Sequence, residues 1–200
     1  MTISLAIDTS TSRTSVAIVD DGALLWHGYR DGATAHGGAL SILVSQALAV
    51  QLTIDRVVVG MGPGPFTGLR VGIAFAITFG QAREVPVFGV CSLDAIAATV
   101  TEQTDFIIAT DARRKEIYWA RYSNGLRVDG PHVDVPSLLD DERPIYGEGA
   151  IKYGLASSDE NQFPDLVALV EISMDSARRV NEAMYLRRPD AQPTSERSPA

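Results

Sequence analysis

The chain has one cysteine and two lysines among its 200 residues, and it has no long uninterrupted apolar run. A single cysteine, Cys91, cannot form an internal disulfide, and the first residues lack the basic and then apolar pattern of a signal peptide. The stretch from 57 to 82 is weakly charged, but it contains Arg70, two prolines and several glycines, which disfavour a transmembrane helix. These absences predict a cytoplasmic protein without a membrane segment.

Positive charge is also scarce. The formal net charge is -8, and the cations are arginines apart from Lys115 and Lys152. Because neutralisation of phosphates supplies most of the affinity for nucleic acids, this balance argues against direct, high-affinity binding to RNA or DNA. Hydrophobic residues make up 46% of the chain, and a chain of this length buries roughly 70% of its surface on folding. One domain or two small lobes are expected.

The first half of the chain alternates between strand and helix patterns. Extended patterns at 3–7, 14–19 and 23–27 predict a three-stranded meander whose first strand ends in a polar turn beginning at Asp8. Helical spacing of apolar residues follows at 37–51, then a buried strand at 56–61, a glycine- and proline-rich loop at 62–68, and a second helix reaching about 82. Thr67 is the expected N-cap of that helix. A strand at 86–90 and a helix beginning at Ser92 complete the order βββ-α-β-α-β-α.

The second half repeats the opening of the first. Two strand patterns, at 106–110 and 116–122, flank a polar turn, and a short helical patch at 137–139 and a strand at 144–147 follow. An amphipathic helix is predicted at 174–188, and the polar, proline-rich residues 189–200 indicate a disordered tail. We therefore predict two similar α/β lobes, 1–102 and 103–188, of which the second is shortened.

Asp8, Thr9 and Ser10 stand where the first strand ends. A carboxylate and hydroxyls at this place could orient a metal-bound water and reach a phosphate, or they could form a capped polar turn. The residue types favour the turn.

Small residues recur at intervals of four on the second helix, at Gly68, Gly72, Ala76 and Gly80, and so share one face. That face could pack on the protein's own sheet or receive another helix. Leu69, Ile73 and Ile77 form an adjacent apolar stripe.

Three cations, Arg113, Arg114 and Lys115, occupy the turn of the second half. Such a turn is either a solvated tip or a contact for an acidic partner or for RNA phosphates. The three histidines lack metal-ligand spacing, so no metal site is expected. Cys91 is interpreted as a small buried hydrophobic residue.

Four segments, taken together, resemble the bacterial TsaB (YeaZ) family: residues 5–10, the Gly-Pro-Gly-Pro-Phe-Thr-Gly segment with the residues after it to 72, residues 111–120, and Tyr185-Leu186-Arg187-Arg188. The resemblance implies a two-lobed ASKHA (actin-like ATPase, RNase H-like) fold. It also implies a non-catalytic scaffold in the machinery that makes threonylcarbamoyladenosine in tRNA, paired with the TsaD transferase and recruiting the TsaE ATPase. Pro65 departs from the family's usual serine. Ser10 stands where ATPases of this fold keep glycine, so Asp8, Thr9 and Ser10 are expected to form a degenerate phosphate loop.

The resemblance also implies an interface. The two long helices are expected to dock against the TsaD-like paralogue, or against a second copy when the chain is alone, through ten residues: His36, Leu40, Leu43, Val44, Thr67, Gly68, Leu69, Gly72, Ile73 and Ala76. The chain is expected to bind no cofactor of its own, with ATP and Mg²⁺ present only in the assembled complex. Arg113 and Arg114 are possible contacts for tRNA or a partner, and tRNA is otherwise reached through the complex. An ATP-dependent small-molecule kinase with Asp8 or Asp111 as base is the alternative, and a glycoprotease-like peptidase is a weaker one.

Overall fold

The computed structural model describes residues 2–32, 36–101, 105–139, 142–158, 160 and 162–187. The predicted tail at 189–200 and the centre of the predicted lobe boundary, residues 102–104, lie outside them. Within the described residues, no helix has both the length and the apolar character that crossing a membrane requires.

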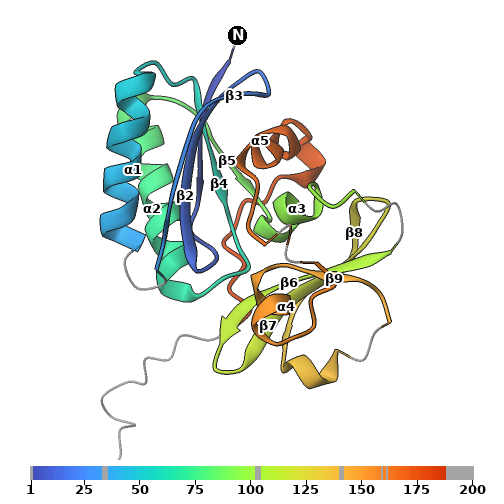
Figure 1. Cartoon of the computed structure of the whole chain (residues 1–200). Coiled ribbons are helices and arrows are strands. Elements are labelled where there is room, and N and C mark those ends of the chain that lie inside the picture. The colour runs from blue at the N-terminus through green and yellow to red at the C-terminus, as the bar shows by residue number, and fades with distance from the viewer. Residues whose placement is uncertain are drawn as a thin grey trace, which may run out of the picture.

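The first sheet has five strands, in the order β3-β2-β1-β4-β5. The three antiparallel strands of the meander are β1 (Ile3–Asp8), β2 (Arg13–Asp20) and β3 (Ala23–Asp31), and β4 (Arg56–Gly60) and β5 (Val87–Val90) add in parallel. The helices α1 (His36–Val50) and α2 (Phe66–Arg83) cover one face, and α3 (Ser92–Ala97) and α5 (Leu166–Met174) lie on the other side (Figure 1). Because helices cover both faces, β1 and β4 are buried along their whole length.

The second sheet repeats this plan with one strand fewer, in the order β8-β7-β6-β9. Its strands are β6 (Phe106–Arg113), β7 (Glu116–Ser123), β8 (Leu126–Asp134) and β9 (Ile145–Tyr146). After β9 comes α4 (Glu148–Lys152), five residues long, in the place that the 18-residue α2 takes after β4. A 3-10 turn, Pro136–Leu138, precedes β9. The predicted two-lobed α/β fold with a shortened second lobe is confirmed.

The prediction of a helix at 174–188 is wrong. The regular helix is α5, which ends at Met174, and a short 3-10 turn, Ser176–Arg178, follows it. Beyond that turn the backbone is extended: the Val180 N–H donates to the Gly89 carbonyl at 2.9 Å, and Arg179 bridges to Val90. Val180 and Met184 are therefore packed, half-buried, from an extended strap between the lobes rather than from one face of a helix.

Two local predictions also need correction. The helix α2 begins one residue before Thr67, at Phe66, and its N-cap is Pro65, which provides no side-chain hydrogen bond. The sequence pattern also misses strand β8, which follows the predicted strand at 116–122. Its exposed and half-buried residues do not alternate regularly around the Gly130-Pro131 pair, so the pattern of a strand is lost there.

The small-residue face of α2 points inward. Gly68, Gly72, Ala76 and Gly80 are all buried, and β-carbons at Gly68 and Gly72 would overlap the carbonyl and hydroxyl oxygens of Thr9. Of the two alternatives for this face, packing within the chain is the one found, because the turn after β1 fills the space that another helix would need. This close approach fixes α2 on the sheet.

We expect Gly72→Ala to lower the free energy of unfolding by about 1–3 kcal/mol, since the new methyl group would overlap the Thr9 hydroxyl. Gly38→Ala in α1 is the matched control: no atom lies within 4 Å of its new β-carbon, so the variant should gain about 1 kcal/mol from helix propensity. Urea denaturation measures both. Thr9→Ala combined with Gly72→Ala should lose less than the sum of the single variants, and strict additivity would contradict the packing.

Candidate functional site

The candidate site lies where the two lobes meet, at the ends of the first strand of each sheet. Asp8 is the last residue of β1, and Asp111 stands near the end of β6. Both carboxylates are buried, with exposed fractions of 1% and 4%. The hydrogen-bond partners of the two carboxylates differ.

Asp8 is enclosed by groups of its own lobe. One carboxylate oxygen accepts the N–H and the hydroxyl of Ser10 at 2.9 and 2.8 Å, and the other accepts the Ser92 hydroxyl at 2.6 Å. Burial raises the pKa of Asp8 above its usual value of 3.8, while these three hydrogen bonds oppose the rise. Gly60 has no room for a side chain beside this carboxylate.

The turn that follows Asp8 is closed to ligands. Gly64 lies so close to Ser10 that a β-carbon on Gly64 would overlap the Ser10 carbonyl, and Ser10 itself is 1% exposed. The Thr9 hydroxyl donates to the Gly68 carbonyl at 2.8 Å. In this arrangement the glycine loop occupies the space beside Asp8, Thr9 and Ser10.

Asp111 is held by cations of the second lobe. It accepts the Lys152 ammonium at 2.7 Å, the Tyr153 hydroxyl at 3.2 Å and the backbone N–H of Arg113 at 3.0 Å, and the Arg113 guanidinium lies 3.3 Å away. Contact with Asp111 raises the pKa of Lys152. Both carboxylate oxygens therefore have partners: Oδ1 accepts from Tyr153 and the Arg113 backbone, and Oδ2 faces the Lys152 ammonium and the Arg113 guanidinium.

Glu148 joins the two lobes, and it is absent from the predicted site residues. Its carboxylate accepts the backbone N–H of Ser12 at 3.1 Å and also the Ser12 hydroxyl. Burial raises the pKa of Glu148. The sequence signal that could have found Glu148 is Gly147-Glu148-Gly149, which follows β9 as Gly62-Pro63-Gly64 follows β4. Ser92, by contrast, lies in no motif that marks its contact with Asp8.

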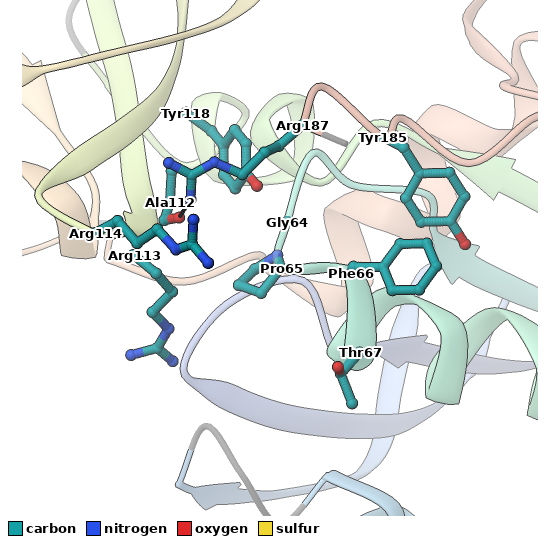
Figure 2. A pocket seen from close by; sticks show the side chains of 10 residues that line it. All are labelled: Gly64, Pro65, Phe66, Thr67, Ala112, Arg113, Arg114, Tyr118, Tyr185 and Arg187. Atoms are coloured by element: carbon teal, nitrogen blue, oxygen red, sulfur yellow. Dashed lines mark hydrogen bonds between the residues drawn. The ribbon is translucent and has the colours of Figure 1, made fainter. Parts of the chain in front are cut away.

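A small cavity opens beside this junction (Figure 2). It has a volume of about 150 Å³, and residues from three segments line it: Gly64, Pro65, Phe66, Thr67, Ala112, Arg113, Arg114, Tyr118, Tyr185 and Arg187. In Figure 2 the arginines of the β6–β7 turn lie on one side of Pro65, and the rings of Phe66 and Tyr185 lie on the other. The structure thus brings Arg113 and Arg114 to the same cavity as Thr67.

Most residues of the expected docking set are not on the surface. His36, Leu40, Leu43, Val44, Gly68, Leu69, Gly72 and Ala76 are buried within the chain itself. His36, for example, lies 2.8 Å from the Thr14 hydroxyl through Nδ1, and burial lowers its pKa. Thr67 is exposed and Ile73 is half-buried. The predicted docking set is therefore wrong at its buried positions, because these side chains face the sheet of their own chain and are not open to a partner.

The outer face of the same two helices is open to solvent. Ile42 of α1 and Ile77 of α2 are 47% and 43% exposed. A shallow groove on α2 is lined by Phe66, Thr67, Arg70, Val71 and Ala74. Any surface that these helices offer to a partner is this outward face.

Among the described residues, no group of three or more His, Cys, Asp or Glu side chains is arranged to hold a metal ion. Cys91 is fully buried, and desolvation raises the pKa of its thiol to about 12, so it is no nucleophile. The interpretation of Cys91 as a buried hydrophobic residue is confirmed.

The buried charge of Asp8 predicts a pH dependence of stability. Its pKa is raised on folding, so the native state holds the proton more tightly, and the contribution of Asp8 to stability falls as the pH rises above about 3.8. We expect Asp8→Asn, which carries no charge, to gain stability relative to the unmodified chain between pH 4 and 7. Urea denaturation across this range measures the difference, and a difference that is constant or that grows toward acid would contradict it.

Comparison with known proteins gives consistent matches. A family model described as tRNA N6-adenosine threonylcarbamoyltransferase (TsaD) matches residues 31–139. An uncharacterized protein of Mycobacterium leprae is 43% identical over 207 residues, which cover 96% of this chain and 57% of that protein. The tRNA threonylcarbamoyladenosine biosynthesis protein TsaB of Escherichia coli is 35% identical over 125 residues, which cover 59% of this chain and 54% of TsaB. The chain thus spans little more than half the length of these two relatives.

The fold agrees with these matches. The structure of YeaZ from Pseudomonas aeruginosa superposes with a TM-score of 0.71 at 26% identity, covering 87% of this chain and 91% of YeaZ. Because a family model covers more than half of the sequence and a YeaZ structure covers most of the fold, the chain belongs to the TsaD/YeaZ (TsaB) family, which is related to threonylcarbamoyladenosine biosynthesis.

Proposed function

We propose that the chain is a non-catalytic subunit of the machinery that makes threonylcarbamoyladenosine in tRNA, where it pairs with a TsaD-like transferase and recruits a TsaE-like ATPase. The observation that carries this proposal is the closed turn after β1. Asp8, Thr9 and Ser10 are each 1% exposed, and their polar atoms are bonded within the chain. A lobe built in this way supports a scaffold rather than an enzyme that binds its own nucleotide.

The outward face of α1 and α2 is the proposed pairing surface. Exposed apolar side chains such as Ile42 and Ile77 lie there beside the shallow groove around Arg70 and Ala74. Association buries such side chains favourably. The same face can pair with its own copy around a two-fold axis, so a homodimer forms when the transferase is absent.

In this proposal ATP and Mg²⁺ bind only in the assembled complex, where another subunit supplies the phosphate-binding groups. Transfer of the threonylcarbamoyl group takes place on the TsaD-like partner. Recognition of tRNA is shared with that partner, since the net charge of -8 disfavours a strong complex with this chain alone.

Calorimetry with Mg-ATP tests the assignment as a non-catalytic subunit. We expect no heat of binding from the chain alone and clear binding when the TsaD-like partner is present. Ser10→Gly should also remain silent, because the backbone of Gly64 still covers the turn after the side chain is removed. Micromolar binding by the chain alone would overturn the proposal in favour of the kinase alternative.

The pairing surface is tested by a charge on the outward face of α2. Ile77→Asp should weaken binding to the TsaD-like partner roughly tenfold or more, because a carboxylate would be desolvated in the interface. Leu126→Asp is the matched control: this leucine of β8 is 56% exposed, in the other sheet. Surface plasmon resonance compares the two variants. Equal affinities would show that the outward face of α2 is not the interface.

A further inference from the structure

We propose that the cavity between the β2–β3 turn and α5 binds a free α-amino acid in its zwitterionic form. The cavity lies at the end of the first sheet where β1 and β4 begin, whereas the closed turn follows Asp8 at the other end of β1. Six residues line it: Asp21, Gly22, Arg56, Val170, Glu171 and Met174. This inference goes beyond the proposed function and does not rest on it.

Arg56, the first residue of β4, is a buried cation. Only 7% of its surface is exposed. Its Nε donates to the Ser4 hydroxyl at 2.7 Å and its Nη1 to the Met174 sulfur at 2.6 Å, and neither partner carries a charge. Among the described residues, no carboxylate forms an ion pair with Arg56. Because a buried charge without a counter-charge is costly, an anionic group that enters the cavity is bound favourably.

The Arg56 guanidinium keeps donors for a carboxylate. It has five N–H groups, and the contacts with Ser4 and Met174 use two of them. A thioether is a weak acceptor, and Met174 is flexible and 59% exposed, so a carboxylate can displace its sulfur. Arginine binds a carboxylate through two parallel, charge-assisted hydrogen bonds. Arg56 therefore suits the carboxylate end of the ligand.

Glu171 of α5 supplies the opposite charge. It is an exposed residue that lines the same cavity, and it too has no ion-pair partner in the described part of the chain. No basic residue lies in the last turn of α5, so the negative end of the helix dipole adds to this charge. One cavity thus holds a cation and an anion that are not paired with each other. A ligand with one carboxylate and one ammonium group neutralises both.

The charge balance disfavours anions without an ammonium group. Asp21 and Glu171 both line the cavity, so a phosphate or a dicarboxylate would bring two negative charges toward two carboxylates. Asp21 already accepts the Thr2 N–H at 3.0 Å, which leaves Glu171 to receive the ammonium group. This arrangement favours a zwitterion over a simple anion.

The size and the walls of the cavity fit a small amino acid. Its volume is about 300 Å³, at the lower end of the range of roughly 300–1,000 Å³ that is common for small-molecule pockets. Val170 and Met174 provide an apolar wall between the two charged groups' elements, α5 and the start of β4. Such a wall suits a small apolar side chain.

Isothermal titration calorimetry with L-valine tests the site. We expect saturable binding at pH 7, and roughly tenfold weaker binding of N-acetyl-L-valine and of L-valinamide, which each keep only one of the two charges. Glu171→Gln should weaken the binding of L-valine roughly tenfold, but it should not weaken that of N-acetyl-L-valine. Glu182→Gln is the matched control, since this exposed glutamate does not line the cavity. Absence of saturable binding, or equal affinities for the three compounds, would overturn the proposal.

Urea denaturation distinguishes a ligand site from an ion pair within the chain. We expect Arg56→Met and Glu171→Gln to have additive effects on the free energy of unfolding, because the two side chains do not interact. Coupling between them would show that Glu171 neutralises Arg56, and it would overturn the proposal. Arg56→Met should bind no L-valine but should bind the TsaD-like partner with unchanged affinity. Failure of the amino-acid site and failure of the proposed function are therefore separate outcomes.

Discussion

The buried carboxylate of Asp8 is the constraint on which the first lobe depends. A charge in this place is tolerable only because Ser10 and Ser92 donate three hydrogen bonds to it. Those bonds fix the turn after β1, and Gly60 and Gly64 leave the space that the turn needs. The position of α2 follows, because its small-residue face packs on Thr9 of the same turn.

The two lobes share the order strand, glycine segment and helix, but the glycine segment makes different contacts in each. In each, a strand runs into a Gly-x-Gly segment and then a helix, and each segment begins with a glycine at positive φ, Gly62 at 93° and Gly147 at 108°. In the first lobe the loop seals the turn beside Asp8. In the second, the middle residue, Glu148, reaches across to Ser12 and links the lobes. Groups that could have faced a ligand thus serve to close the structure.

The solvent-exposed surfaces of the chain differ in character. The outward face of α1 and α2 carries exposed apolar side chains, and the strap at 179–187 crosses from the first sheet to the β6–β7 turn. Arg187 is the last described residue of this strap, and it lines the cavity between α2 and the β6–β7 turn. The chain therefore presents an apolar helix face and, between the lobes, a cavity with arginines in its lining.

Local hydrophobic period and turn residues are enough to predict the strands and helices of the first lobe, the first two strands of the second sheet and the burial of Cys91. The direction in which each face points depends on contacts between distant segments. The stripe of Gly68, Gly72 and Ala76 has the same spacing whether it meets a partner or its own sheet, and the inward choice depends on Thr9, 59 residues away from Gly68 in the chain. In the same way, residues 174–188 have a helical period, yet Arg179 pairs with Val90 and the Val180 N–H donates to the Gly89 carbonyl, so the chain is extended there instead of helical. Contacts between segments distant in sequence have no local signal, so the closed turn, the Glu148 link and the cavity follow from the fold.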